Sequence, residues 1–231
     1  MKNIFDNTNI DSQTKLENFT KYTTRRSLTR FIAHQELFKM QLNIQGNIMD
    51  CGVHHGGSLM TWAKLSSIYE PINYQRKIYG FDTFSGFPDI HENDKGNIHA
   101  KEGSFDESSK YDVFSELNEV IKTYDEDRFI SNIEKVFLVK GDVKFTIPKF
   151  VEENKFCLVS MLYLDFDIYE PTLIALKNFI PRMSKGSIIA FDELNNKNWP
   201  GETIALLESL DIKNYNIKRF SFEPNISYLI L

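Results

Sequence analysis

Two short acidic segments follow two apolar runs in the second half of the chain. The run Leu158–Leu164 leads into Asp165–Asp167, and the run Ser187–Phe191 leads into Asp192–Glu193. Near-continuous apolar runs are typical of strands that are covered on both faces of a parallel sheet. Because the C-terminal ends of neighbouring parallel strands converge on one crevice, we expect these acids to lie close together.

Four carboxylates in a partly buried crevice would repel one another unless a cation lay among them. Oxygen ligands suit Mg²⁺ with retained waters, Ca²⁺ or Mn²⁺ better than zinc. Such a cation can hold a substrate hydroxyl, lower its pKa and stabilise the developing alkoxide. The alternative is structural: Asp167 and Glu193 cap helices, while Asp165 and Asp192 accept hydrogen bonds from loop amides.

A glycine-rich segment, Ile48–Leu59, is the other feature that can do chemistry. Its apolar start, the glycines after it and the amphipathic run that follows predict a strand, a loop and a helix. Such a junction lets a ligand approach bare backbone at the positive end of a helix, although glycines also serve ordinary turns. The next predicted strand, Ile78–Phe81, ends in Asp82, where a carboxylate can accept both hydroxyls of a ribose or cap a turn.

A third predicted strand, Val136–Val139, is followed by Gly141 and Asp142. Asp142 either meets the base of a nucleotide cofactor or caps the helix that begins near Val143. The terminal runs Tyr215–Phe220 and Ile226–Leu231 read as a hairpin that closes the sheet.

The N-terminal part is predicted to frame this sheet. We expect a frayed start up to Ser12, then a long helix from Thr14 to Leu42 that packs on the main domain or on a second subunit. Its arginines are assigned to a solvated face: Arg25, Arg26 and Arg30. The polar stretch 85–111 has no clear period, which favours a mobile cover over the site.

Composition limits the classes of protein. With 231 residues, of which 42% are hydrophobic, the chain can bury one substantial core. A net charge of −5 without a basic stripe argues against nucleic-acid binding. Cys51 and Cys157 lie in apolar runs, which favours buried free thiols. Without a long apolar stretch or a signal-peptide pattern, we expect no membrane association and a cytoplasmic location.

Four ordered motifs give the chain a family resemblance. They are Asp-Cys-Gly-Val-x-x-Gly-Gly-Ser at 50–58, Tyr-Gly-Phe-Asp-Thr-Phe-Ser-Gly-Phe-Pro at 79–88, Leu-Asp-Phe-Asp-Ile-Tyr-Glu-Pro-Thr at 164–172 and Phe-Asp-Glu-Leu at 191–194. Through these motifs the chain resembles the macrocin O-methyltransferases. Members of that family depend on S-adenosylmethionine, and several methylate deoxysugar hydroxyls of natural products. Together the motifs are more specific than a glycine loop alone.

The resemblance implies an α/β class I methyltransferase (Rossmann-like) fold. We expect a mostly parallel seven-stranded sheet with helices on both faces, spanning 44–231, and a helical extension over 1–43 that joins a homo-oligomer. The implied acceptor is a sugar-containing small molecule. The implied contacts with S-adenosylmethionine come from Asp50, Gly52, Val53, Gly56, Ser58, Asp82, Thr83, Phe84, Gly141 and Asp142.

The implied metal ligands are Asp165, Asp192 and Glu193, with Mg²⁺ or another divalent cation. The lysine that catechol-type enzymes use as a base is Ile168 here. We therefore assign the catalytic proton transfer to Asp165 or Asp167, and only after them to His54 or His55.

Two alternatives remain at this point. A nicotinamide-dependent oxidoreductase would share the strand, loop and acid, but the loop does not match G-x-G-x-x-G and the acid pairs would have no role. A catalytically silent scaffold would bind the cofactor, or a partner through its N-terminal helix.

Overall fold

The computed structural model describes residues 2–95 and 97–231. Helices and strands alternate along most of the chain, as expected for an α/β fold. The helices are α1 (Lys2–Asn7), α2 (Ser12–Glu17), α3 (Arg25–Gln41), α4 (Gly57–Tyr69), α5 (Val113–Asp127), α6 (Val143–Glu153), α7 (Tyr169–Phe179) and α8 (Gly201–Ser209). The strands are β1 (Asn47–Cys51), β2 (Ile78–Asp82), β3 (Val136–Lys140), β4 (Val159–Leu164), β5 (Met183–Phe191), β6 (Lys218–Arg219) and β7 (Ser227–Ile230).

These strands form one seven-stranded sheet in the order β3-β2-β1-β4-β5-β7-β6. The first five strands are parallel, and β7 runs antiparallel to both β5 and β6. The chain reverses direction across the sheet between β1 and β4, and ligands of open α/β sheets bind at such a switch point. The predicted sheet and its closing hairpin are confirmed, although β6 is shorter than the predicted run.

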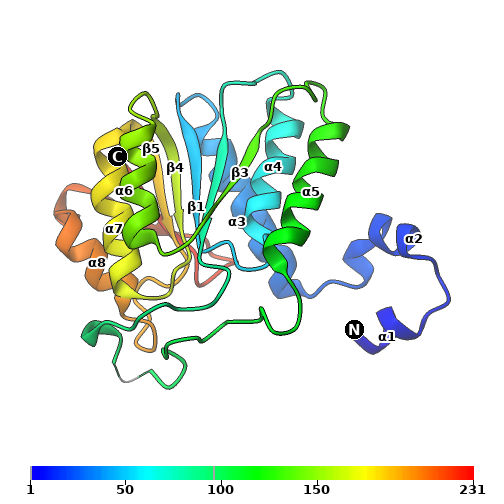
Figure 1. Ribbon diagram of the computed structural model, residues 1–231, viewed down its shortest axis with the longest axis horizontal. Coiled ribbons are helices and arrows are strands. Elements are labelled where there is room, and N and C mark those ends of the chain that lie inside the picture. Colours follow the sequence, from blue (N-terminus) through cyan, green and yellow to red (C-terminus); the bar gives the residue numbers. More distant parts are fainter. Residues whose placement is uncertain (1, 96) are drawn as a thin grey trace.

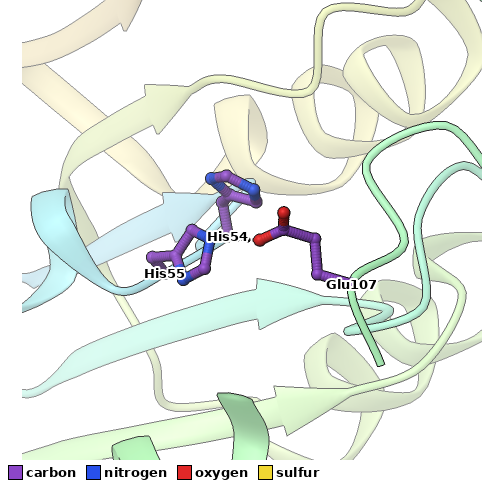
Figure 2. Close-up of side chains that lie close together, drawn as sticks. All are labelled: His54, His55 and Glu107. Atoms are coloured by element: carbon purple, nitrogen blue, oxygen red, sulfur yellow. Dashed lines mark hydrogen bonds and ion pairs between the residues drawn. The ribbon is translucent and has the colours of Figure 1, made fainter. Parts of the chain in front are cut away.

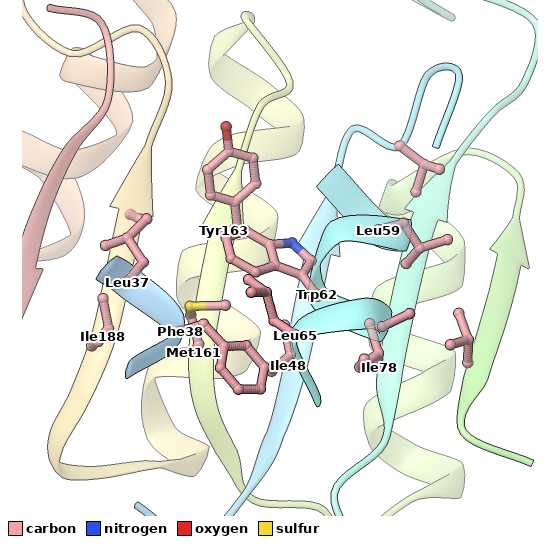
Figure 3. Close-up of a cluster of buried hydrophobic side chains, with 14 of the residues drawn as sticks. Leu37, Phe38, Ile48, Leu59, Trp62, Leu65, Ile78, Met161, Tyr163 and Ile188 are labelled. Atoms are coloured by element: carbon pink, nitrogen blue, oxygen red, sulfur yellow. The ribbon is translucent and has the colours of Figure 1, made fainter. Parts of the chain in front are cut away.

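Helices cover both faces of the sheet, with α3, α4 and α5 on one face and α6, α7 and α8 on the other (Figure 1). Side chains that alternate along each strand feed two separate cores, because successive strand residues point to opposite faces. On β1, Ile48 faces the α3–α5 core and Met49 the α6–α8 core. Trp62, Tyr163 and Phe38 are among the largest fully buried side chains of the first core (Figure 3).

The N-terminal region differs from the prediction. It contains α1 where a frayed start was expected, and the single helix predicted from Thr14 to Leu42 is interrupted. Thr24 marks the break, because it accepts a hydrogen bond from the amide of Ser27 and begins α3; Asp11 accepts one from the amide of Thr14 and begins α2. Each cap starts a new helix. The apolar periodicity of the sequence therefore continues across a position where the helix is interrupted.

The predicted cover, 85–111, is largely without regular structure and is anchored in its middle. Asp94 lies in a 3₁₀ turn, is almost fully buried, and accepts the amide hydrogen of Tyr169 at the start of α7 with both carboxylate oxygens, at 3.1 Å. The segment is therefore tied to the C-terminal end of β4. No helix among residues 2–95 and 97–231 is long and apolar enough to span a bilayer.

Candidate active site

The glycine loop after β1 is shaped by contact with the neighbouring strand. Gly52 has a φ of 94°, and a Cβ atom there would lie 2.0 Å from the carbonyl oxygen of Asp165. The amide of Asp165 in turn donates to the carbonyl of Cys51 at 2.8 Å. Only glycine allows this close approach of two backbones. Gly56, with a φ of 82°, then forms the left-handed N-cap of α4.

Asp50 lies beneath this loop and not in it. Its side chain is fully buried and accepts hydrogen bonds from Ser58 Oγ at 2.9 Å and from Trp62 Nε1 at 3.0 Å. Burial raises the pKa of Asp50 to about 7, against the effect of these two hydrogen bonds. Its carboxylate therefore holds the start of α4 against β1.

Asp82 connects the ends of β1 and β2. One carboxylate oxygen accepts the amide hydrogen of His54 at 2.8 Å, and the other accepts that of Phe84 at 2.7 Å. Both of these partners have left-handed backbones, with φ of 48° and 55°. Such conformations are costly for residues other than glycine and gather at functional sites. Asp82 therefore fixes two strained turns while its oxygens retain lone pairs for a ligand.

Asp142 serves as the helix cap that was one of its two predicted roles. It accepts the amide hydrogen of Lys144 at 2.9 Å at the start of α6. The preceding Gly141 donates its amide hydrogen to the carbonyl of Asp82 at 2.9 Å, which joins the ends of β2 and β3.

A cavity of about 800 Å³ opens at these strand ends. Most of the predicted cofactor residues line it: Gly52, Val53, Ser58, Asp82, Thr83, Phe84 and Asp142. Asp50, Gly56 and Gly141 lie outside its lining. Three of the four acids that follow β4 and β5 also line it, namely Asp165, Asp167 and Asp192.

Asp165 and Asp192 are bridged by an arginine. Nη2 of Arg30 lies 2.8 Å from Oδ2 of Asp165, and its Nη1 lies 2.8 Å from Oδ1 of Asp192. The same Nη2 donates to the hydroxyl of Tyr163 at 3.1 Å. The assignment of Arg30 to a solvated face is therefore wrong: a guanidinium from α3 lies between two of the acids. Burial and the charge of Asp192 raise the pKa of Asp165, and Arg30 opposes them.

In the part of the chain that the structure describes, the other acids near β4 and β5 have no ion pair with Arg30 to offset their negative charge. Burial, followed by the charges of Glu193 and Asp192, raises the pKa of Asp167 to about 7, and its φ of 63° is left-handed. Burial also raises the pKa of Glu193, whose side chain accepts a hydrogen bond from Asn196. Glu202 of α8 is fully buried: one oxygen accepts the amide hydrogen of Glu193, and the other has no hydrogen-bond partner within the described ranges.

Comparison with known proteins decides the family. Residues 20–205 match the family described as macrocin O-methyltransferase (TylF). This chain belongs to the macrocin O-methyltransferase family. The predicted resemblance and the predicted enzyme class are confirmed, and the protein is an S-adenosylmethionine-dependent O-methyltransferase.

Solved structures agree with this assignment of a macrocin-type methyltransferase. The crystal structure of the calicheamicin methyltransferase CalS11 is 34% identical, with a TM-score of 0.94, and the match covers 99% of this chain and 89% of that one. The apo structure of CalS11, described as a TDP-rhamnose 3'-O-methyltransferase, is 31% identical, with a TM-score of 0.84 and coverage of 99% and 90%.

A more distant structure shares the fold. The O-methyltransferase NovP is 20% identical, with a TM-score of 0.64 and coverage of 87% and 78%. No curated protein sequence matches this methyltransferase. The class I methyltransferase fold predicted from the motifs is confirmed.

One group in this methyltransferase was missed by sequence reasoning, the facing side chains of His54, His55 and Glu107 (Figure 2). His55 Nε2 lies 2.7 Å from Oε2 of Glu107, which also accepts the hydroxyl hydrogen of Tyr111 at 2.6 Å. Hydrogen bonds from Tyr111, Lys110 and His55 lower the pKa of Glu107 to about 2. Residues 107–111 are thereby latched to the glycine loop, a contact between segments 52 positions apart that no local pattern signals.

Proposed function

We propose that this enzyme transfers a methyl group from S-adenosylmethionine to a hydroxyl of a sugar-containing small molecule, with the help of a divalent cation. One observation carries the proposal. The same cavity is lined by the predicted cofactor residues Gly52, Ser58 and Asp82 and by two carboxylates that follow β4, Asp165 and Asp167. Donor and acceptor can therefore meet within one cavity.

The cofactor side of the cavity suits S-adenosylmethionine. We assign Gly52 and Ser58 to its methionine part and Asp82 to its ribose hydroxyls, because these residues match the family motifs and line the cavity. We assign Asp142, which lines the cavity, to the base beyond the ribose. Val53, Thr83 and Phe84 supply the wall between them. We assign indirect roles to the remaining three: Asp50 and Gly56 shape the glycine loop, and Gly141 supports the end of β2 at Asp82.

Aromatic side chains support a sugar acceptor. Phe87 and Phe105 line the cavity, with ring centroids 5.3 Å apart. The ring of Trp199 lies 6.1 Å from that of Phe87 and 6.2 Å from that of Phe105. Aromatic groups with few polar neighbours fix the position of a small ligand by contact area. The match to CalS11, described as acting on TDP-rhamnose, makes nucleotide-activated deoxysugars the first acceptors to test.

The acids fit a divalent cation by donor type and by charge, but the ligand atoms of Asp165, Asp192 and Glu193 do not all lie within 4.8 Å of one another, so binding would need them to move together. The group supplies oxygen donors alone, which Mg²⁺, Mn²⁺ and Ca²⁺ prefer. Burial raises the pKa values of Asp167 and Glu193, so their ionised forms lack sufficient nearby positive charge. We assign Asp165, Asp192 and Glu193 as the residues that would hold the cation. When bound, it would polarise the acceptor hydroxyl and lower its pKa.

Asp167 is the stronger candidate for the base, because Asp165 is engaged by Arg30. A pKa near 7 suits a general base at neutral pH, since the base is then both ionised and strong enough to take a proton. Asp167 also has a left-handed backbone, a conformation that is costly for a residue other than glycine and that gathers at functional sites. His54 and His55 lie on the cofactor loop and rank behind both acids.

The test uses S-adenosylmethionine with a labelled methyl group and a panel of acceptors that begins with TDP-rhamnose. Mass spectrometry should detect a labelled methyl ether on a sugar hydroxyl, and chelation with EDTA should abolish the product until Mg²⁺ is restored. Asp167→Asn should lose turnover while calorimetry shows unchanged cofactor binding. Product formation at full rate in EDTA would remove the metal from the proposal, and methylation confined to acceptors without sugars would remove the sugar.

We also propose that the enzyme self-associates through its N-terminal segment, 1–43. Figure 1 shows α1 and α2 extending away from the sheet. They and the turn that follows expose apolar side chains, with Ile4 60%, Leu16 64% and Phe19 49% accessible. Light scattering on the intact chain should give more than one subunit, and Leu16→Ser with Phe19→Ser should give a monomer. A monomeric parent protein would contradict this.

A further inference from the structure

Arg30 lies in the place where a cation was predicted from sequence. Its guanidinium reaches one carboxylate oxygen of Asp165 and one of Asp192, each at 2.8 Å. These acids follow the adjacent strands β4 and β5, where Leu164 is the register partner of Phe191. The arginine therefore closes the gap between two strand ends with a single planar group.

The bridge is largely screened from solvent. The Arg30 side chain is 31% exposed, that of Asp165 22%, and that of Asp192 7%. Charges in such a setting are screened less than surface pairs, so the arginine opposes the repulsion between the two acids.

A polar network holds Arg30 in this position. Tyr163 accepts a hydrogen bond from Nη2 of Arg30, and its hydroxyl also lies 3.2 Å from Nε2 of His34, one helical turn along α3. Burial and the positive charge of Arg30 lower the pKa of His34 to about 3, so its ring stays neutral beside the guanidinium. α3 is thus fixed to β4 at the site itself.

We propose that Arg30 is the resident counter-cation of Asp165 and Asp192 and competes with the divalent cation for them. A metal ion needs carboxylate oxygens at roughly 2.0–2.6 Å. Two of the four oxygens of this pair are engaged by Arg30, and its positive charge would lie beside the incoming ion. In this proposal, metal loading displaces Arg30 from at least one of the two acids, which makes α3 the element that sets metal affinity. This inference rests on the metal dependence proposed above.

The direct test compares metal binding, not turnover. Mn²⁺ is titrated into EDTA-treated full-length protein and followed by calorimetry and by the electron paramagnetic resonance signal of free Mn²⁺. Arg30→Gln should bind Mn²⁺ more tightly than the parent protein, by on the order of tenfold or more, as expected when a competing ligand is removed. Arg25→Gln is the matched control, because Arg25 is exposed on the same helix and loses the same charge.

The outcomes separate the two proposals. Equal or weaker Mn²⁺ binding by Arg30→Gln overturns the competition and leaves metal dependence standing. Absence of binding in both proteins, each folded by circular dichroism, overturns metal dependence and this inference with it. Tighter binding in Arg25→Gln as well would reduce the effect to general charge and overturn the specific role of Arg30.

A second measurement needs no variant of the site. In the parent protein, the Nε–Hε resonance of Arg30 is followed by nuclear magnetic resonance while Mg²⁺ is added. Release of the carboxylates should shift this resonance in step with metal occupancy. An Arg30 resonance that stays unchanged at saturating Mg²⁺ overturns the proposal even if Arg30→Gln fails to fold.

Discussion

Asp50 should make the enzyme less stable as the pH rises, and Asp50→Asn should remove that loss. The folded carboxyl has a pKa of about 7, mainly because it is fully buried, whereas its ordinary value is near 3.8. Between these two values the folded state binds more protons than the unfolded state. The contribution of Asp50 to stability is therefore fully present below pH 3.8 and is lost as the pH rises through 7.

The magnitude follows from the shift. About three pKa units at about 1.4 kcal/mol each give a loss of about 4 kcal/mol once Asp50 is ionised. Asparagine stays neutral, can still accept the indole hydrogen of Trp62, and can donate to Ser58 Oγ. The free energy of unfolding of Asp50→Asn, relative to the parent protein, should rise by roughly 2–3 kcal/mol between about pH 5 and about pH 8.

Urea unfolding followed by far-ultraviolet circular dichroism across this pH range measures the difference. Asp112→Asn is the control, because Asp112 is an exposed helix cap whose pKa is lowered by its hydrogen bonds with Ser115. Because its pKa is lowered, the Asp112 carboxyl is ionised in both the folded and the unfolded state above about pH 5, so its variant should show no pH-dependent difference from the parent protein in this range. Parallel pH profiles for Asp50→Asn and the parent protein would refute the reasoning, since the buried carboxyl would then not be the group that titrates.

Three further perturbations probe the site and its support. Gly52→Ala should lower the free energy of unfolding by about 3 kcal/mol or more, because the added Cβ would meet the backbone of Asp165. The control Gly57→Ala, which has open space at Cβ, should leave stability nearly unchanged. Equal thermal midpoints of the two variants would contradict this. Arg76→Lys should lower the free energy of unfolding in urea by about 2 kcal/mol or more. The buried guanidinium donates to the carbonyls of Leu42, Ile44 and Gly46, and one ammonium group cannot reach all three. An unchanged unfolding midpoint would contradict this. Glu107→Gln should weaken the contact between residues 107–111 and His55. Because an exposed ion pair contributes at most about 1 kcal/mol, the affinity for S-adenosylmethionine measured by calorimetry should fall by no more than about fivefold. Tighter binding would show that this contact opposes the cofactor.

The sheet was predictable because its signal is local. Each parallel strand is a short apolar run, and each of the first three ends at a polar residue or glycine that starts a loop. Asp82, Asp165 and Asp192 were placed at one edge by this rule alone, and they share the wall of one cavity. The caps at Asp11 and Thr24 could also have been found, since both are favoured N-cap residues. The apolar periodicity that continued across them concealed the breaks.

What could not be predicted depends on tertiary contacts. Glu202 looks like an ordinary first-turn acid of α8, which is favourable at a helix N-terminus. The structure buries it fully beside the other acids, and burial raises its pKa well above the ordinary value. Likewise, nothing around Asp94 indicates that it satisfies the first amide of α7. Both residues belong to the support of the site, which becomes visible only when the packing is known.

Arg30 shows why acid pairs at strand ends do not by themselves specify a metal. Repulsion among carboxylates requires a positive charge but does not say which one. Here Arg30, 135 positions before Asp165, reaches the pair from a helix on one face of the sheet. If catalysis uses the proposed cation, a permanent bridge would deny that cation its coordination positions. Without the bridge, the buried acids would be unpaired until the cation binds, which is strongly destabilising. An arginine that can leave meets both demands, and the Mn²⁺ affinity of Arg30→Gln measures how strongly it holds the pair.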